Sequence, residues 1–319
     1  MRLRCAVLDD FQGVATELAD WSVIEDEVEV VALREHIDGE DALAAVLADY
    51  DIVVTLRERV PFPGSLLARL PRLKLLVASG MRNSVIDYAA AEAGGVTVCG
   101  TESSGTPPVE LTWALLLGLA RGIVEENNAL RANGPWQSTV GADLYGRRLG
   151  LLGLGRIGSR VARVGLAFGM RVTAWSRHLT EERAAETGVE LAASKEELLA
   201  ESDFVSVHLA LGEGTRGLVG AAELALMKPS AYLINTSRAA IVDQDALLAA
   251  LHEGRIAGAG VDVFDIEPLP AGHPMRTAPR LLATPHLGYV SHANCTTYYR
   301  QAVEDIQAYL AGSPVRRLP

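Results

Sequence analysis

The sequence has few cysteines and a shortage of positive charge, and each shortage excludes a class of protein. Its three cysteines (Cys5, Cys99 and Cys295) stand far apart among 319 residues without metal-ligand spacing, so we expect neither a disulfide scaffold nor a metal site. Unpaired cysteines fit a reduced compartment, and we expect a cytoplasmic protein. The formal net charge of −11 disfavours nucleic acid and anionic membranes as main partners. A small anionic ligand is compatible with this negative net charge, because a local cluster of arginines can make its binding site positive.

Long hydrophobic runs are also missing. The longest candidate, VELTWALLLGLA at 109–120, contains Glu110 and is shorter than the roughly 20 residues that cross a bilayer. Two interpretations of this segment stay open: a helix buried inside one subunit, and a helix packed between two subunits. The N-terminal stretch MRLRCAVLDD is typical of a first strand and has no secretory apolar region. We therefore expect no membrane partner.

The alternation of apolar runs with helical stretches predicts two α/β domains. A chain of 319 residues is longer than a single core usually spans. Strand–helix alternation is typical of doubly wound parallel sheets. The expected strands are CAVLDD, VEVVAL, DIVVTL, LKLLVAS and VTVCG in the first part, and RLGLLGLG, RVTAWSR, DFVSVHLA, AYLINTS, IAGAGVDVF and RLLATPHLG in the second.

The domain boundaries follow from two helices. Pro107 and Pro108 suit the first turn of a long helix, in the stretch TESSGTPPVELTWALLLGLARGIVEENNALRANGPW, that crosses from the first domain into the second. A last helix at about 293–310 returns after the second alternation ends. We place one domain at 1–100 together with 288–319, and the other at 101–287.

The stretch GLGRIG, between a predicted strand and a predicted helix, indicates a dinucleotide-binding turn. Gly153 allows the tight turn, Gly155 lets the backbone approach a pyrophosphate, and Gly158 lets the helix pack against the strand. The N–H groups of Arg156 and Ile157 begin the helix, where a phosphate is favoured. Because strand, turn, helix and strand follow in order, we expect the domain at 101–287 to bind the cofactor.

The acidic residue that usually follows such a turn is missing here. The strand RVTAW ends on Ser176, where Asp or Glu would bind the ribose 2′-hydroxyl of NAD, and Arg177 comes next. A serine does not repel a 2′-phosphate and an arginine binds one, so we expect NADP to be slightly favoured over NAD. The alternative is that Arg177 lies in solvent or stacks on adenine. NAD would then still bind, held by the pyrophosphate contacts.

Three later strands each lead to a residue suited to carbonyl reduction. These residues are Arg238, Glu267 and His286. The carboxyl ends of parallel strands line the ligand crevice of an open α/β sheet. Reduction of a 2-oxo acid needs a cation for the carboxylate, for which the arginine fork is suited, and an acid near neutrality for the carbonyl oxygen. Histidine fills the second role when a carboxylate orients it.

The chain resembles the D-isomer-specific 2-hydroxyacid dehydrogenases over nearly all its length, in the motifs LGLLGLGRIGSRVA, DFVSVHLALGEGTRGLVG, LALMKPSAYLINTSR, VDVFDIEP and TPHLG. The resemblance implies two Rossmann-like domains with a cleft between them, the smaller one flavodoxin-like and substrate-binding. It implies an NAD(P)-dependent 2-oxo acid reductase that assembles as a homodimer, with the helix of ELTWALLLGLAR packed in the dimer. In it, Arg238 would bind the substrate, and Glu267 would orient His286 as the acid and base.

The resemblance also implies further contacts. Asp262 would face the nicotinamide carboxamide, and Ser79, Gly80 and Met81 would offer backbone N–H groups to the substrate carboxylate. The other expected cofactor residues are His208, Thr215, Thr236, Ser237 and Gly288.

Arg57 and Arg82 are candidates for an anionic substrate tail, although a solvated arginine is the plainer interpretation of each. For His208, a structural histidine is as good an interpretation as a cofactor contact. We expect Trp136 to be a packing residue at a subunit interface. The family often has Pro and Gly where this chain has Ala210 and Ala239; Ala239 would be strained if its φ were positive.

A dinucleotide-sensing corepressor is the alternative function. A formate dehydrogenase is a weaker alternative, because the histidine–glutamate pair fits carbonyl reduction better.

Overall fold

The computed structural model describes residues 2–319, and by its contacts the chain divides into two units. The first unit comprises the residues up to 104 together with 291–319, and the second comprises 105–290. The predicted boundaries at 100 and 287 stand four and three residues before those of the structure.

The first unit is built on a five-stranded sheet in the order β2-β1-β3-β4-β5, and all its strand pairs are parallel. This order is that of flavodoxin-like folds. β3 and β4 are buried along their whole length, as parallel strands covered on both faces are. The strands are β1 (Leu3–Val7), β2 (Val28–Ala32), β3 (Ile52–Thr55), β4 (Leu75–Ala78) and β5 (Thr97–Gly100). The helices are η1 (Trp21–Ile24), α1 (Glu40–Leu47), α2 (Gly64–Leu67), α3 (Tyr88–Ala93) and α11 (His292–Leu310).

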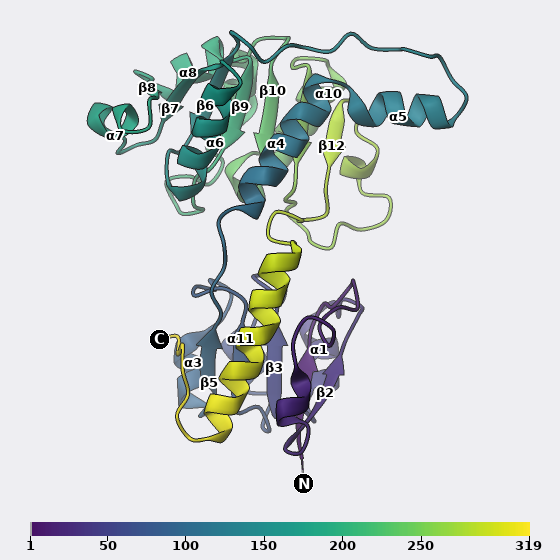
Figure 1. The fold of residues 1–319 in the computed structure, drawn as a ribbon, viewed down its shortest axis with the longest axis vertical. Coiled ribbons are helices and arrows are strands. Elements are labelled where there is room, and N and C mark those ends of the chain that lie inside the picture. Colours follow the sequence, from purple (N-terminus) through teal and green to yellow (C-terminus); the bar gives the residue numbers. More distant parts are fainter. Residues whose placement is uncertain (1) are drawn as a thin grey trace. The chain divides into compact units, whose positions relative to one another are not determined.

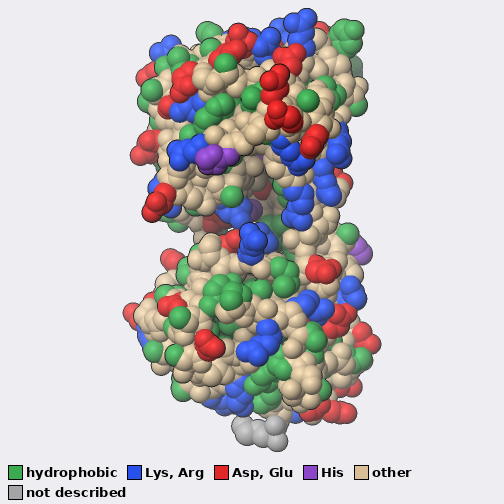
Figure 2. Space-filling model, turned by 90° about the vertical axis from the view of Figure 1, so that its left-hand side faces the viewer, with side chains coloured by type: hydrophobic (Ala, Val, Ile, Leu, Met, Phe, Trp, Pro, Cys, Tyr) green, Lys and Arg blue, Asp and Glu red, His purple; other side chains and the backbone are tan. Residues whose placement is uncertain are grey.

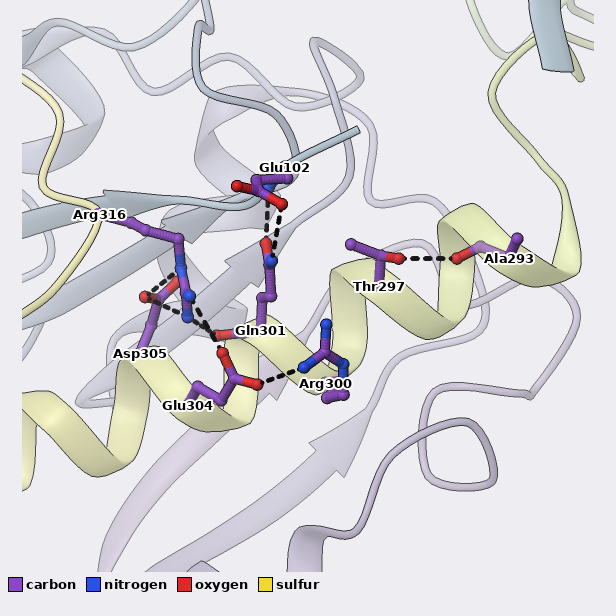
Figure 3. A network of polar contacts seen from close by, with 8 residues as sticks. All are labelled: Glu102, Ala293, Thr297, Arg300, Gln301, Glu304, Asp305 and Arg316. Atoms are coloured by element: carbon purple, nitrogen blue, oxygen red, sulfur yellow. Dashed lines mark hydrogen bonds and ion pairs between the residues drawn. The ribbon is translucent and has the colours of Figure 1, made fainter. Parts of the chain in front are cut away.

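The C-terminal tail fastens α11 to the edge of this sheet. Residues 316–318 run antiparallel to β5, with the N–H of Gly100 donating to the carbonyl of Arg316 (2.9 Å). The Arg316 guanidinium donates to Asp305 and Glu304 on α11, at 3.0 Å each (Figure 3). Gln301 on the same helix accepts from the N–H of Glu102 at 2.6 Å. α11, which returns to the first unit after the second, is thus hydrogen-bonded both to the C-terminal tail and to the segment that follows β5.

The second unit is built on a seven-stranded parallel sheet in the order β12-β11-β10-β9-β6-β7-β8. Counted from β6, this is the 3-2-1-4-5-6 order of dinucleotide-binding folds with a seventh strand added. The strands are β6 (Arg148–Leu152), β7 (Arg171–Trp175), β8 (Glu190–Leu191), β9 (Phe204–Val207), β10 (Tyr232–Asn235), β11 (Gly258–Val261) and β12 (Leu281–Ala283). Only β8, which has two residues, was absent from the sequence prediction.

Helices cover both faces of this sheet, and each face has its own hydrophobic cluster (Figure 1). α4 (Pro107–Ala120) and α6 (Arg156–Ala167) pack against each other, and α4 also packs on β10 and β11. The other helices are α5 (Ile123–Arg131), α7 (Glu181–Ala185), α8 (Lys195–Glu201), α9 (Ala221–Leu226), η2 (Ala239–Ile241), α10 (Gln244–His252) and η3 (Pro274–Arg276).

The long helix predicted after Pro107 is two helices in the structure. Gly122 adopts a φ of 57°, a left-handed conformation that ends α4 and turns the chain by 62° into α5. The apolar side chains of α4, among them Trp113, Leu115 and Leu116, are buried within their own unit. Within the described residues no single helix is both long and apolar enough to cross a bilayer, and only α4 and α5 together, across their bend, reach that length and composition.

Candidate active site

The glycine turn lies between β6 and α6 as predicted, and its three glycines face different surroundings. Gly153 has a φ of 104°, which suits glycine alone. A Cβ on Gly158 would overlap the Gly153 carbonyl, so close helix–strand packing excludes a side chain there. At Gly155, by contrast, no atom of the described chain lies within 4 Å of where a Cβ would be, and the residue is exposed. The turn therefore presents bare backbone outward at the N-terminus of α6.

This arrangement fits a dinucleotide. The first N–H groups of a helix have no partner within it, and the helix dipole favours an anion at that end. α6 has 12 residues, and its N-cap, Gly155, has no side chain that could occupy the position of a pyrophosphate. Arg156 is exposed at the start of the helix, and Ile157 is partly buried against the core below.

The end of β7 carries Ser176, half-buried, and Arg177, exposed. The Arg177 guanidinium is held against the turn after β9: a Cβ on Gly214 would meet its Nη1 at 2.9 Å. Figure 2, which views the side of the second unit that carries α7 and β8, shows basic side chains and a histidine grouped there. The Arg177 guanidinium therefore lies beside this turn while the residue as a whole is exposed.

His208 and Thr215 shape the turn that follows β9. The carbonyl of His208 lies 2.7 Å from where a Cβ on Gly153 would be, and its Nε2 is 2.9 Å from Ser206 Oγ. Burial lowers the pKa of His208 to about 4, so the ring is neutral near pH 7. Thr215 Oγ1 donates to the carbonyl of Ala210 at 2.7 Å and accepts from the N–H of Gly212 at 2.9 Å. Both side chains have structural partners that account for them.

The strand β10 leads directly into Thr236, Ser237 and Arg238. Thr236 Oγ1 lies 2.8 Å from Thr112 Oγ1 on α4, and Ser237 Oγ donates to the carbonyl of Leu209. The half-buried Arg238 donates from Nη1 to the carbonyl of Ser237 at 2.8 Å. The next residue, Ala239, begins the short helix η2 and is not among the described residues with positive φ, so its replacement of the family's glycine introduces no strain.

The turns after β11 and β12 bring Glu267 and His286 into contact. His286 Nδ1 lies 2.5 Å from Glu267 Oε2, and Glu267 Oε1 accepts from the N–H of Phe264 at 2.8 Å. The side chains of the pair are 20% and 22% exposed, so the imidazole is held by the carboxylate yet reachable by a ligand. His286 itself has a φ of 52°, which is uncommon for a residue with a side chain.

Asp262 and Gly288 bond to each other. The N–H of Gly288 donates to Asp262 Oδ2 at 2.7 Å, and Oδ1 accepts from Thr284 and Leu287. Burial raises the pKa of Asp262, while these three donors act in the opposite direction. The side chain is 0% exposed.

The substrate candidates of the first unit lie at the carboxyl ends of β3 and β4. Arg57 has a φ of 53°; its N–H donates to Ser79 Oγ at 2.7 Å, and its guanidinium lies over Gly80. The N–H of Ser79 donates to the carbonyl of Thr55 and that of Gly80 to Thr101 Oγ1, so these two predicted substrate donors are engaged within the unit. Met81 and Arg82 are exposed.

Sequence reasoning missed two residues that shape this region. Asn235 is 2% exposed; it accepts from the N–H of Ser237 and donates to the carbonyl of Arg238. Gly214 lies so close to the Arg177 guanidinium that a Cβ there would come within 2.9 Å of Nη1. A polar residue that closes an otherwise apolar strand is a usable signal for Asn235; nothing in the sequence pairs Gly214 with Arg177. Among residues 2–319 no group of three His, Cys, Asp or Glu side chains is placed to hold a metal ion.

The comparisons with known proteins agree with this geometry. A family model described as the D-isomer specific 2-hydroxyacid dehydrogenase, NAD binding domain, matches residues 113–288. The glyoxylate reductase of Aeropyrum pernix is 40% identical over 256 residues, 77% of this chain and 76% of that protein. The D-3-phosphoglycerate dehydrogenase of Bacillus subtilis is 34% identical over 296 residues; the match covers 92% of this chain but only 55% of that protein. The crystal structure of a phosphoglycerate oxidoreductase from Vibrio cholerae superposes with a TM-score of 0.92 at 34% identity, over 98% of this chain and 100% of that one.

The fold, the glycine turn and the family match together define an oxidoreductase that uses a nicotinamide dinucleotide. The chain belongs to the D-isomer specific 2-hydroxyacid dehydrogenase family. Its reaction is hydride transfer between the nicotinamide and C2 of a 2-oxo or 2-hydroxy acid, and these relatives do not favour the corepressor alternative.

Proposed function

We propose that Arg238, Glu267 and His286 carry out this reaction. The observation that carries the proposal is the contact of His286 Nδ1 with Glu267 Oε2 at 2.5 Å, at the carboxyl edge of the sheet where β10, β11 and β12 are neighbours. The bound cofactor supplies the hydride. The Arg238 guanidinium binds the substrate carboxylate and polarises the carbonyl. As hydride reaches C2, His286 donates its Nε2 proton to the carbonyl oxygen, and the product is the 2-hydroxy acid.

Glu267 orients the imidazole for this role, because its carboxylate is 2.5 Å from Nδ1. The contact also fixes Nδ1 as the nitrogen facing the protein, so Nε2 is the one directed to substrate. His208 does not compete for the role, since burial lowers its pKa to about 4.

The cofactor preference that we propose is NADP over NAD. Its support is the absence of a carboxylate after β7 together with the position of Arg177 on the turn at Gly214. A guanidinium there offers charge-assisted hydrogen bonds to a 2′-phosphate. The predicted dinucleotide contacts of Gly153, Gly155, Arg156, Ile157 and Gly158 form part of the same proposal.

The substrate proposed is a small 2-oxo acid. Glyoxylate and phosphoglycerate appear in the names of the relatives, and either chemistry is compatible with Arg57 and Arg82 as candidates for an anionic tail. Of the three predicted backbone donors we retain Met81, which is exposed, because the N–H groups of Ser79 and Gly80 already have acceptors within the first unit.

We propose further that the protein is a homodimer. None of the side chains of α5 is buried within the chain, and the segment after it exposes Trp136, Val140 and Tyr145. Exposed aromatic and aliphatic groups of this kind mark association surfaces. Light scattering should give a dimer for the wild type and a smaller species for Trp136→Ala; a monomeric wild type would rule the proposal out.

We also propose a cytoplasmic location, because the three cysteines are unpaired, as in a reduced compartment.

The test of the function is the steady-state oxidation of NADPH and NADH against a panel of 2-oxo acids, with Arg238→Ala and His286→Ala beside the wild type. We expect turnover that both substitutions abolish while the fluorescence-detected binding of the cofactor persists. Turnover that survives His286→Ala would refute the assignment of the proton donor.

A further inference from the structure

We propose that Glu58 is a specificity-determining residue: it neutralises Arg57 beside the turn 79–83 and selects 2-oxo acids whose remainder carries no second negative charge. Both residues follow β3 in the first unit. Phosphorylated and dicarboxylic 2-oxo acids are then poor substrates, and those with a short neutral or hydroxylated remainder are good ones. This inference rests on the proposed function, in which Met81 of the same turn donates to the substrate carboxylate.

Arg57 is built into this turn. Its N–H donates to Ser79 Oγ at 2.7 Å, and its carbonyl accepts from Asn83 Nδ2 at 2.7 Å. Asn83 is 3% exposed, so the second bond is shielded from water. Arg57 has a φ of 53°, and such a left-handed conformation persists only where the surroundings determine it. The two bonds provide that constraint, so the point at which the Arg57 side chain leaves the backbone is fixed relative to the turn.

The Arg57 guanidinium lies over the turn. A Cβ on Gly80 would overlap its Nη1, and Gly80 has a φ of 103°, which suits glycine alone. The next residue along the chain is Met81, the exposed donor retained for the substrate carboxylate. A positive charge at this point would by itself favour a substrate with an anionic remainder.

Glu58 cancels this charge. Its Oε2 lies 3.6 Å from Arg57 Nε, and both side chains are 21% exposed. The charges of a partly buried pair are screened less than those of an exposed pair. Because the two charges are equal and opposite, a ligand at the turn encounters a carboxylate together with the guanidinium.

The Glu58 carboxylate lies close to two tyrosines from other elements of the first unit. Tyr88, at the start of α3, donates its hydroxyl to the carbonyl of Asn83 at 2.9 Å, and Tyr298 on α11 is 2% exposed. Burial raises the pKa of both tyrosines, and the Glu58 carboxylate acts in the same direction on each. The carboxylate is therefore near the turn, α3 and α11 at once.

The next arginine of this loop has other neighbours. Arg59 lies over the Phe11 ring, 4.9 Å from its centroid, in the loop after β1. Burial raises the pKa of Cys295, Asp10 raises it further and Arg59 lowers it, so a carboxylate accompanies this guanidinium as well. Arg82, on the turn itself, is exposed, where water and salt screen its charge.

The neutral pair at the turn discriminates between substrates by charge. A phosphate or second carboxylate in the remainder would come against the Glu58 carboxylate. Juxtaposed like charges oppose binding, and a site rejects an unwanted ligand in this way. A hydroxyl meets no such opposition, because it can donate to the carboxylate and accept from the guanidinium.

The test compares hydroxypyruvate with 3-phosphohydroxypyruvate, which share a carbon skeleton and differ by one phosphate, in steady-state reduction with NADPH. Glyoxylate, which has no remainder, is the reference for any general effect of a substitution. We expect the wild type to reduce hydroxypyruvate with a kcat/KM at least about tenfold higher than that for 3-phosphohydroxypyruvate. Glu58→Gln keeps the size of the side chain and removes its charge. It should lower this ratio about tenfold, through a lower KM for the phosphorylated substrate.

Three further variants separate charge from structure. Glu58→Asp retains the charge and should retain the preference. Arg57→Gln leaves the carboxylate uncompensated and should raise the ratio. Glu40→Gln removes the same charge from α1, where Glu40 lies 3.6 Å from Arg69, and should leave the kinetics of all three substrates unchanged. A disturbed turn would instead lower kcat/KM for all three substrates in Glu58→Gln and Arg57→Gln alike.

The results that contradict the inference differ from those that contradict the function. A wild type that prefers 3-phosphohydroxypyruvate, or a ratio that Glu58→Gln leaves unchanged, would overturn the inference alone. An equal change of the ratio in Glu40→Gln would assign the preference to the net charge of the protein and overturn it too. If the wild type reduced none of the three substrates with either cofactor, the proposed function would fall, and the inference with it.

Discussion

His286 Nδ1 lies 2.5 Å from Glu267 Oε2, although the two residues are 19 positions apart and follow different strands. The contact makes Glu267 the group that orients the imidazole for proton donation. We expect Glu267→Gln to lower kcat/KM for 2-oxo acid reduction by about a hundredfold, within the range of general acid catalysis.

Steady-state kcat/KM with saturating NADPH checks this prediction. Glu267→Gln retains a hydrogen-bond acceptor for the N–H of Phe264, so the turn after β11 should stay intact. Wild-type kcat/KM in Glu267→Gln would contradict the role of the carboxylate.

Cofactor preference provides the second prediction, which concerns Arg177. Arg177→Ala should lower kcat/KM for NADPH by about tenfold to hundredfold, the contribution of a charge-assisted hydrogen bond, and leave NADH nearly unchanged. Ser176→Asp should act in the same direction, since a carboxylate at the end of β7 repels a 2′-phosphate. Steady-state kinetics with both cofactors measures the ratio. An equal loss for NADPH and NADH would show that Arg177 contacts a part common to the two.

The sequence predicted the strands of both units and the glycine turn because both are local patterns. Parallel strands covered on both faces are continuous apolar runs, and β8 was missed because two residues make no such run. The break between α4 and α5 was missed for a related reason: Gly122 stands within a helical pattern that continues on either side.

The partners of the site residues were predicted less completely than the residues themselves. Glu267 and His286 were expected to pair, and they do. Asp262 bonds to residues 22 to 26 positions further along the chain, and no short-range pattern predicts such a bond. For Ser79 and Gly80 the sequence cannot show that their N–H groups already have acceptors in neighbouring strands and turns.

The three glycines of the turn supply a third prediction with an internal control. Gly155→Ala adds a methyl group where no described atom lies within 4 Å, so the fold should be unaffected while the Kd for NADPH rises at least about tenfold through collision with the pyrophosphate. Gly158→Ala places its methyl group on the Gly153 carbonyl and should instead lower the free energy of unfolding by about 1–3 kcal/mol. Thermal melts and fluorescence titrations of the two variants separate the effects. Unchanged cofactor affinity in Gly155→Ala would refute the assignment of the turn.

The last prediction concerns Asp305, which is 0% exposed and bonded to Arg316 of the tail (Figure 3). Burial raises the pKa of Asp305 to about 7, above the value of about 3.9 for an unfolded aspartate. The folded protein therefore binds the additional proton between these two values, and the contribution of this group to stability is complete below about pH 4 and declines as the pH rises to about 7. An asparagine side chain at this position does not titrate, so Asp305→Asn should destabilise the protein less at pH 8 than at pH 5, relative to the wild type at the same pH. Urea unfolding at both values measures the difference. A larger destabilisation at pH 8 would mean that the ion pair with Arg316 outweighs burial and that the carboxylate is charged throughout.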